Sequence, residues 1–416
     1  MGPPVAFVTL TRSISCVNPE AVIRCRKRLP VSAYRASQTE PKDGDQGELA
    51  EPKKARATLT IYDVASRAGV SIASVSRVLN GLGSPRAETR ERVMQAVREL
   101  SFVPDGAARA LSNGLKEVVG VVFRRGGEEL FEGEDESFLF IDVINRGIEV
   151  GAQRRGFDLL ISSVGFNDDN VAARIAALAG KADGLILHDR MLSAVGIARL
   201  ADMVPVVTLA GSPTPASLNV RCDNEFGIRA LVRHMVIDHG YRSLGYVTGR
   251  ADSPDNRTRL RAFEAEAVAA GAEIETGPAW QGNYSAAGGA NVVASLLNAG
   301  RKLPRAILCA NDQTALGVMH ALAQRGIRVP QDVAITGFDD VPVARHLHPP
   351  LTTIRQPMQE LGAKAFEILY SRISAGGGKP DTVLPVELVV RESCGCASGS
   401  SPASGAALAA RDGQKG

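Results

Sequence analysis

The stretch from residue 58 to residue 81, TLTIYDVASRAGVSIASVSRVLNG, constrains the fold of this chain more than any other. Thr60 followed three residues later by Asp63 has the spacing of a capping box, which begins a helix. Gly69 supplies the backbone freedom that a sharp turn needs, and Ser71 can cap a second helix. The pattern predicts two short helices joined by a tight turn.

Each of these predicted helices has an apolar side at helical period. The apolar residues are Val64, Ala65 and Ala68 in the first helix, and Val75, Val78 and Leu79 in the second. The other side of the second helix carries mostly short side chains, namely Ile72, Ala73, Ser74, Ser76 and Arg77. Short side chains let a helix backbone approach a nucleic-acid groove closely. The pair of helices is therefore expected to contact nucleic acid; a helical pair that only packs is the alternative.

This stretch resembles the helix-turn-helix of the lactose-repressor (LacI/GalR) family of bacterial transcription regulators. The matching residues are Thr60, Asp63, Val64, Ala65, Ala68, Gly69, Val70, Ser71, Val75, Ser76, Arg77, Val78, Leu79 and Asn80. The resemblance implies that Ser71, Ile72, Ala73, Ser74 and Arg77 face the major groove of DNA. It implies that Thr60, Ser76 and Asn80 hold phosphates, and Arg77 is the best candidate for reading guanine through its bidentate fork.

The sequence around this stretch fits a small basic domain over residues 57–104. A third helix is predicted from Pro85 to Leu100, with an apolar stripe formed by Val93, Ala96, Val97 and Leu100. Between residues 53 and 116 there are 11 Lys or Arg and 5 Asp or Glu, an excess of +6, whereas the whole chain carries +3. Positive charge is thus concentrated where the predicted DNA-binding helices lie. A solvated basic surface is the alternative.

Residues 105–116 are expected to form a hinge helix, because DGAARALSNGL resembles that segment of the family. In the family, two hinge helices enter the minor groove when a dimer binds its operator. The resemblance assigns Ala108, Arg109 and Leu111 to the minor groove, with Leu111 as a wedge that partly unstacks one base step. Gly106 and Gly114 predict poor helicity without DNA. An ordinary linker is the alternative.

From residue 118 onward, short apolar runs alternate with amphipathic stretches. The runs lie at 118–123, 157–162, 183–188, 204–209, 243–248, 304–310 and 332–337. Such alternation predicts an α/β fold with parallel sheets. Because the pattern restarts near residue 222, it predicts two similar lobes over residues 117–393. This region resembles the two-lobed, periplasmic-binding-protein-like core of the family, and the chain is expected to cross between lobes near 221–223, 336–339 and 352–356.

Polar residues at the ends of the predicted strands form a candidate effector site, since two-lobed α/β proteins bind small ligands there. The resemblance assigns Arg259 to clamp the effector and Asp312 to accept hydrogen bonds from it. Tyr284 is expected to stack on a ligand ring, and Asp223 lies at a lobe crossing. After the first strand the loop from Arg124 is longer and more acidic than in many members of the family, so Phe138 and Phe140 are expected to line the pocket. Each of these residues could instead be structural: Asp223 and Asp312 as helix caps, Arg259 as a surface ion pair, Tyr284 as packing.

The remaining features exclude other classes of protein. Residues 1–56 are expected to be a disordered or spurious extension, and residues 394–416, rich in Gly, Ala and Ser, a disordered tail. The six cysteines are scattered, and Cys394-Gly-Cys396 lacks a second pair nearby, so we expect incidental thiols, no metal and no cofactor. No apolar run approaches the length of a membrane span, and no secretory signal is evident.

The sequence therefore predicts a cytoplasmic transcriptional regulator, associated with the nucleoid through DNA. It is expected to be a repressor that binds a palindromic operator as a homodimer and responds to a small molecule, a sugar or sugar derivative. Two other classes of protein fit the sequence less well. A transport binding protein leaves residues 58–115 unexplained, and an enzyme lacks any nucleophile, metal-ligand or paired-carboxylate arrangement, because Asp339 and Asp340 are adjacent at a crossing.

Overall fold

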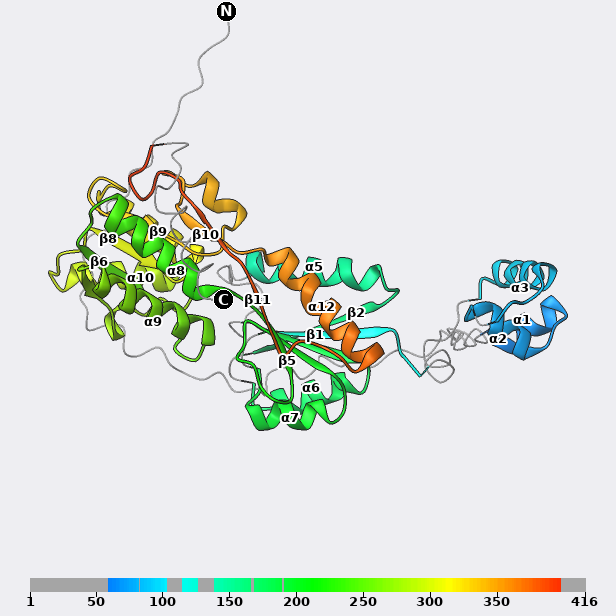
Figure 1. The fold of residues 1–416 in the computed structure, drawn as a ribbon. Helices are drawn as coiled ribbons and strands as arrows, with labels where there is room; N and C mark the ends of the chain where they lie inside the picture. Colours follow the sequence, from blue (N-terminus) through cyan, green and yellow to red (C-terminus); the bar gives the residue numbers. More distant parts are fainter. Residues whose placement is uncertain are drawn as a thin grey trace, which may run out of the picture. The chain divides into compact units, whose positions relative to one another are not determined.

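The computed structural model describes residues 59–81, 83–102, 114–125, 138–165, 168–188 and 191–397 (Figure 1). The expectations for the 1–56 extension, for Ala108, Arg109 and Leu111 of the hinge, and for the tail beyond residue 397 lie outside these residues. Among the described helices, none is both long and apolar enough to cross a membrane.

Three helices form the amino-terminal domain: α1 Ile61–Ala68, α2 Ile72–Leu79 and α3 Ala87–Leu100. Their shared core contains Val64, Val75 and Val93, each fully buried. Gly69 ends α1 with a φ of 62°, and a Cβ at this position would lie 2.7 Å from the guanidinium of Arg92. That guanidinium donates to the carbonyls of Ala68 and Gly69, at 2.6 and 2.9 Å, so α3 holds the turn between α1 and α2.

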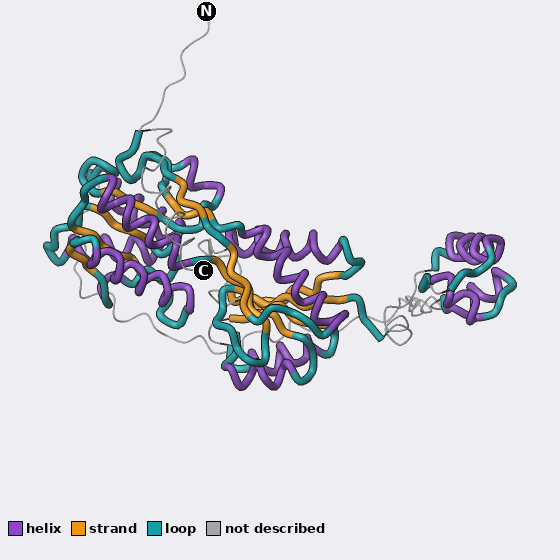
Figure 2. Tube along the Cα trace, in the orientation of Figure 1, coloured by secondary structure: helices purple, strands orange, loops and turns teal. Residues whose placement is uncertain are grey.

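The first lobe of the core is a six-stranded, all-parallel sheet with the strand order β11-β5-β4-β3-β1-β2. Its strands are β1 Val118–Arg125, β2 Asp158–Gly165, β3 Gly184–His188, β4 Val206–Leu209, β5 Leu218–Cys222 and β11 Asp381–Leu384. Helices α5 Phe138–Gln153 and α12 Met358–Ala375 cover one face, and α6 Val171–Ala179 and α7 Ala194–Ala201 cover the other (Figures 1 and 2). The short, fully buried strands β3 and β4 are typical of a parallel sheet with helices on both faces.

The second lobe contains a four-stranded parallel sheet with the order β7-β6-β8-β9. Its strands are β6 Ser243–Val247, β7 Glu273–Glu275, β8 Ala306–Cys309 and β9 Ala334–Thr336. Its helices are α8 Asn224–Arg233 with the π-helical turn η2 His234–Asp238, α9 Pro254–Ala269, α10 Ala286–Asn298, α11 Asp312–Gln324 and the 3-10 turns η3 Pro278–Trp280 and η4 Pro342–His346. Strands β10 Thr353–Arg355 and β12 Glu387–Val389 pair antiparallel beside it.

The crossings between lobes correct one part of the expected topology. The first crossing joins β5 to α8 at residues 222–224, as expected. Residues 336–339 are not a crossing, because the isolated bridges Thr336↔Thr352 and Asp339↔Arg355 keep the following segment beside β9. The second crossing lies between β10 and α12, near its expected position, and the third lies between β11 and β12. The predicted crossing at 336–339 was wrong because the chain stays in the second lobe after β9, where β10 lies beside that segment, and leaves the lobe only after β10.

Close packing of α5 against α12 gives a test of the first lobe. A Cβ on Gly362 of α12 would lie 2.0 Å from the carbonyl oxygen of Ile144 in α5. Because this neighbour is backbone, the helices would have to separate, and we expect Gly362→Ala to lower the free energy of unfolding by about 1–3 kcal/mol. Urea denaturation measures this change.

Gly180 provides the matched control for that substitution. Its φ of −62° suits any residue, and the nearest atom to an added Cβ is at an ordinary 3.5 Å. Gly180→Ala should therefore be neutral, or stabilising by about 0.4–1 kcal/mol. Equal midpoints for Gly362→Ala and the unmodified chain would contradict the packing argument.

Candidate functional site

Helix α2 has one buried side and one exposed side. Val75 and Val78 point into the three-helix core. The residues predicted to face the major groove lie on the solvent side: Ser71, Ile72, Ala73 and Arg77 are exposed, and Ser74 is half-buried. Ile72 is the least expected of these, because a large apolar side chain is left 41% exposed at the start of the helix. An exposed isoleucine beside short polar residues leaves a surface that can contact another molecule.

The hydroxyl groups around α2 and α1 already make local hydrogen bonds. The Ser71 hydroxyl accepts from the Ser74 amide at 3.2 Å and caps α2. The Asn80 side-chain amide donates to the Ser76 hydroxyl at 3.2 Å. The Thr60 amide and hydroxyl both donate to Asp63, at 2.7 and 2.8 Å. These two bonds, the backbone bond first, lower the pKa of Asp63, so the carboxylate stays ionised at the amino end of α1.

Tyr62 was not among the predicted contacts. It lies in the first turn of α1 and is 66% exposed, which is unusual for an aromatic side chain. The sequence could have indicated this exposure, because Tyr62 lies on the polar side of an amphipathic helix, next to the Thr60 cap.

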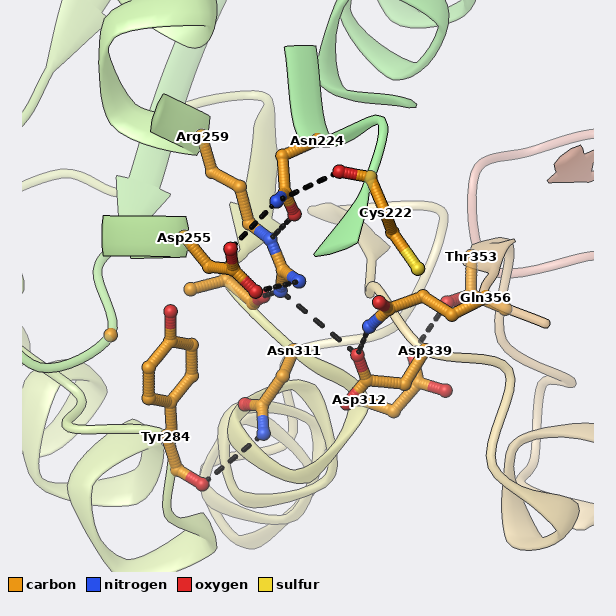
Figure 3. A network of polar contacts seen from close by, with 12 residues as sticks. Cys222, Asn224, Asp255, Arg259, Tyr284, Asn311, Asp312, Asp339, Thr353 and Gln356 are labelled. Atoms are coloured by element: carbon orange, nitrogen blue, oxygen red, sulfur yellow. Dashed lines mark hydrogen bonds and ion pairs between the residues drawn. The ribbon is translucent and has the colours of Figure 1, made fainter. Parts of the chain in front are cut away.

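The second lobe gathers polar residues at the carboxyl ends of its strands (Figure 3). Arg259, in α9, is at the centre and is only 3% exposed. Its Nε donates to the Asn224 carboxamide oxygen at 2.7 Å, and Nη1 donates to the carbonyl of Ala310, just after β8, at 2.6 Å. Its guanidinium lies 3.7 Å from the centre of the Phe338 ring. Arg259 is therefore a buried cation and not the surface ion pair of the alternative reading.

Two carboxylates face this arginine. Asp255 lies one helical turn earlier in α9, with an oxygen 3.8 Å from Nη2, and accepts from Asn224 at 2.9 Å. Asp339, after β9, has an oxygen 4.0 Å from Nη1 and accepts from Gln356 at 2.5 Å. Burial raises the pKa of Asp339 to about 8, so its neutral form prevails at neutral pH. Asp255 is the nearer of the two carboxyl groups to the Arg259 guanidinium.

Asp312 begins α11 directly after β8 and is 1% exposed. Its two oxygens accept from the Thr353 hydroxyl at 2.5 Å and from the Val341 amide at 2.9 Å. Burial raises the pKa of Asp312 to about 6, against the effect of these two donors. Asn311, not Asp312, caps α11, because its side chain accepts from the Thr314 amide at 3.0 Å. The helix-cap reading of Asp312 is therefore incorrect, and its carboxylate joins the segment after β9 to β10.

Tyr284 lies at the edge of the same group. Its ring packs on Gly249, after β6, so tightly that a Cβ there would lie 2.2 Å from the ring. Its hydroxyl is 3.4 Å from that of Ser253, and its carbonyl accepts from Asn311 at 3.2 Å. Tyr284 has a φ of 65°, a left-handed conformation that a bulky residue rarely adopts. Such strain occurs preferentially at functional sites.

The other two predicted effector contacts lie at the first lobe crossing and in the first lobe, and their contact with a ligand stays a prediction. Asp223 caps α8, accepting from the Phe226 amide at 3.0 Å, which is the structural role weighed for it. Phe140 lies in α5 of the first lobe and is half-buried against the core. The side chain of Phe138 and the loop 126–137 lie outside the described residues.

Several residues of the site escaped the sequence analysis. Asn224, Asp255 and Gln356 hold Arg259 and its partners in place. The spacing of Asp255 and Arg259, four residues apart on one helix, was the available signal. A further buried polar group lies outside this cluster, in the first lobe: His188, at the carboxyl end of β3, is 6% exposed, and its Nε2 finds no hydrogen-bond partner among the described residues. Burial lowers the pKa of His188 to about 4, so the imidazole is neutral at neutral pH.

Two family models match this chain. The model for bacterial regulatory proteins of the lacI family matches residues 60–105, and the model for the periplasmic binding protein-like domain matches residues 232–394. The first of these ranges covers the three-helix domain. The second covers most of the second lobe, together with α12 and β11 of the first lobe.

Curated proteins and solved structures resemble the chain over most of its length. The HTH-type transcriptional repressor PurR of Pasteurella multocida (strain Pm70) is 30% identical over 338 residues, which cover 80% of this chain and 98% of that protein. The ribose operon repressor of Haemophilus influenzae is 31% identical with the same coverage. The lac repressor dimer bound to operator and the anti-inducer ONPF has a TM-score of 0.70 at 30% identity, covering 81% of this chain and 99% of that one. The complex of the transcriptional regulator CelR with cellobiose has a TM-score of 0.57 at 29% identity, covering 80% and 99%.

Proposed function

This chain belongs to the lacI family of bacterial regulatory proteins, and on that premise we propose that it represses transcription by binding a palindromic operator as a dimer. It is a transcriptional regulator with an amino-terminal helix-turn-helix and a two-lobed core. The observation that carries the proposal is the surface of α2, which exposes Ser71, Ile72, Ala73 and Arg77 opposite its buried valines.

The proposed roles of the DNA contacts follow from chemistry. Arg77 reads a guanine, because its planar fork can donate two hydrogen bonds to one base edge. Ser76, Asn80 and Thr60 contact phosphates, and the exposed hydroxyl of Tyr62 adds a further phosphate contact. The hinge residues Ala108, Arg109 and Leu111 are proposed for the minor groove on the family resemblance alone.

Selection from a randomised palindrome library tests the proposal. The purified chain should retain a subset of sequences at moderate salt, and their affinity should fall steeply as salt increases. If no palindrome is enriched over the unselected library, the regulator proposal fails.

Removal of the Arg77 side chain should weaken operator binding. We expect Arg77→Ala to cost about 1–3 kcal/mol on the selected operator and to relax the preference at one base pair. Fluorescence anisotropy on the operator and on its single-base variants measures both effects.

Arg98 supplies the control, because it is an exposed arginine of the same domain but lies in the last turn of α3. Arg98→Ala removes the same charge, and its effect should be smaller and equal across sequences. An unchanged base preference in Arg77→Ala would remove Arg77 as a base reader.

We also propose that the chain binds a small effector rich in hydroxyl groups at the carboxyl ends of the second-lobe strands. Arg259, Asp312 and Tyr284 offer a guanidinium, a carboxylate and a half-buried aromatic ring within one group (Figure 3). Solved relatives are named with cellobiose and with ribose, which supports a sugar-like ligand. Arg259 and Asp312 already have protein partners, so a ligand would use their remaining donor and acceptor capacity.

We assign His188 as the contribution of the first lobe to this site. Its neutral imidazole lies at the strand end of the first lobe from which ligands are usually bound, and a ligand hydroxyl would satisfy its Nε2. The effector controls operator affinity only through its different affinities for the two states of the protein. Thermal-shift screening of sugars, sugar phosphates and purines identifies it, because a ligand of the native state raises the melting temperature.

A further inference from the structure

Four potential metal ligands meet where the end of helix α8 contacts the last residues of the core. They are His234 and His239, in and just after the π-helical turn η2, and Cys394 and Cys396, after β12. One ligand atom from each residue lies within 4.8 Å of the other three. We propose that these four residues bind one zinc ion.

The distances between the ligand atoms fit a tetrahedral ion. Zinc with usual bond lengths separates two nitrogens by about 3.3 Å and a nitrogen from a sulfur by about 3.6 Å. The two histidine Nε2 atoms lie 3.3 Å apart. Nε2 of His234 is 3.4 Å from the Cys394 sulfur and 3.7 Å from the Cys396 sulfur, and Nε2 of His239 is 3.3 Å from the Cys396 sulfur.

The orientation of His234 also suits a ligand. Its Nδ1 lies 2.8 Å from a carboxylate oxygen of Asp238, so Nδ1 carries the proton and donates it. The lone pair of Nε2 then points at His239 and the two sulfurs. A carboxylate behind a ligating histidine is the usual outer support of a zinc site.

Neighbouring side chains fix Cys394 and the glycine that separates the two cysteines. The Thr352 hydroxyl lies 3.1 Å from the Cys394 sulfur and donates to it. The Tyr241 hydroxyl donates to the Cys394 carbonyl at 3.0 Å, while its ring stacks on His239 with centres 5.1 Å apart. Gly395 has a φ of 106°, and a Cβ there would lie 2.8 Å from the Tyr241 hydroxyl, so only glycine fits between the cysteines.

The π-helical turn explains how both histidines reach the same point. A π-turn inserts an extra residue into a helix, and such insertions occur often at functional sites. Here the amides of His239 and Tyr241 donate to the carbonyls of His234 and Met235, at 3.2 and 3.1 Å, and close the end of α8 back on itself. As a result His239 turns towards His234, with ring centres 4.8 Å apart.

The sequence expectation of incidental cysteines considered only residues close in the chain. The second pair of ligands exists, but His234 and Cys394 are separated by 160 residues. With four protein ligands the site is closed, so the ion is structural. It joins the last residues of the core to the helix that opens the second lobe.

Cobalt titration of the full chain tests the proposal. The starting protein carries Cys16→Ser and Cys25→Ser, because those cysteines lie outside the described residues. After chelation and reduction, Co²⁺ should bind at about one equivalent per chain, with the strong visible bands of tetrahedral cobalt and a sulfur-to-cobalt charge-transfer band. Zn²⁺ should displace the cobalt and raise the melting temperature.

Two substitutions assign that signal to the site. Cys396→Ser, at a half-buried position, should remove most of the charge-transfer intensity and the thermal stabilisation by Zn²⁺. Asp238→Ala leaves all four ligands and should weaken cobalt affinity by about 10–100-fold. Cys309→Ala and His346→Gln, a cysteine and a histidine outside the cluster, should bind cobalt like the starting protein.

Circular dichroism and the melting temperature without metal show that each variant folds. Folded Cys396→Ser that binds Co²⁺ with unchanged intensity overturns the proposal. The proposal is also overturned if the reduced starting protein shows no charge-transfer band when Co²⁺ is added. A Cys394–Cys396 disulfide that persists under cytosolic thiol conditions, found by mass spectrometry, also overturns it and makes the pair a redox element.

Discussion

Arg259→Ala is expected to lower the free energy of unfolding by about 3–5 kcal/mol and to abolish the response to the effector. The arginine is almost fully buried and donates to Asn224 and to the Ala310 carbonyl. Its removal takes away the cation that faces the buried carboxyl groups of Asp255 and Asp339. Breaking a buried pair is costly because the remaining charge is desolvated and unbalanced.

Urea denaturation of the variant measures the loss of stability, and ligand titration measures the loss of response. Arg261, which is exposed on the same helix α9, provides the control, and Arg261→Ala should change stability by less than about 0.5 kcal/mol. A double variant with Asp255→Asn separates the two contributions, because replacing the acidic group that faces Arg259 should recover part of the stability but not the effector response. If Arg259→Ala is as stable as Arg261→Ala, the Arg259 guanidinium does not stabilise the polar cluster in Figure 3.

The second large effect is a loss of stability in acid that depends on His188. Burial lowers the pKa of this imidazole from 6.5 to about 4 in the folded chain. Below pH 6.5 the unfolded chain takes up a proton that the folded chain takes up only near pH 4. The stability contribution of His188 is therefore complete above pH 6.5 and is lost as the pH falls to about 4, by about 3 kcal/mol in total.

Comparison with His188→Gln isolates this contribution from the other titrating groups. Between neutral pH and about pH 4, the free energy of unfolding should fall by about 3 kcal/mol more in the unmodified chain than in the variant. His320→Gln, at an exposed histidine of α11, should follow the unmodified chain. Parallel pH profiles for His188→Gln and the unmodified chain would show that His188 titrates normally and is not buried as described.

The proposed contact between His188 and the effector also predicts how ligand affinity depends on pH. If a ligand hydroxyl donates to Nε2, ligand binding should stabilise the neutral imidazole further, and affinity should fall in acid. This effect belongs to the proposed site and requires the ligand to be identified first.

Local features of the structure followed from the sequence. The helices α1 and α2, the Thr60–Asp63 pair, the Gly69 turn and the Ser71 cap all lie within a few residues of one another. The seven predicted strands of the core also form, because each is a short apolar run bounded by turns. Strands β5, β7 and β10 to β12 were missed. They are three to five residues long, and their residues are only partly apolar.

In the candidate site too, the residues in local motifs were predicted, and the residues that depend on tertiary contacts were not. Arg259, Asp312 and Tyr284 were identified because each stands in a recognisable local motif. Their partners were not, because Asn224, Asp255 and Gln356 acquire a role only when separate elements meet at the ends of the strands.

By itself, the sequence determined the family, the helix-turn-helix and the alternation of strands and helices, since hydrogen bonds of caps and turns and the period of apolar residues act between near neighbours. Only the tertiary structure decided which polar groups are buried and which share a site. The pKa values of His188, Asp312 and Asp339 come from desolvation, which depends on the whole surrounding fold. His234 and Cys394 likewise meet only because η2 packs against the segment after β12, an arrangement that no local pattern records.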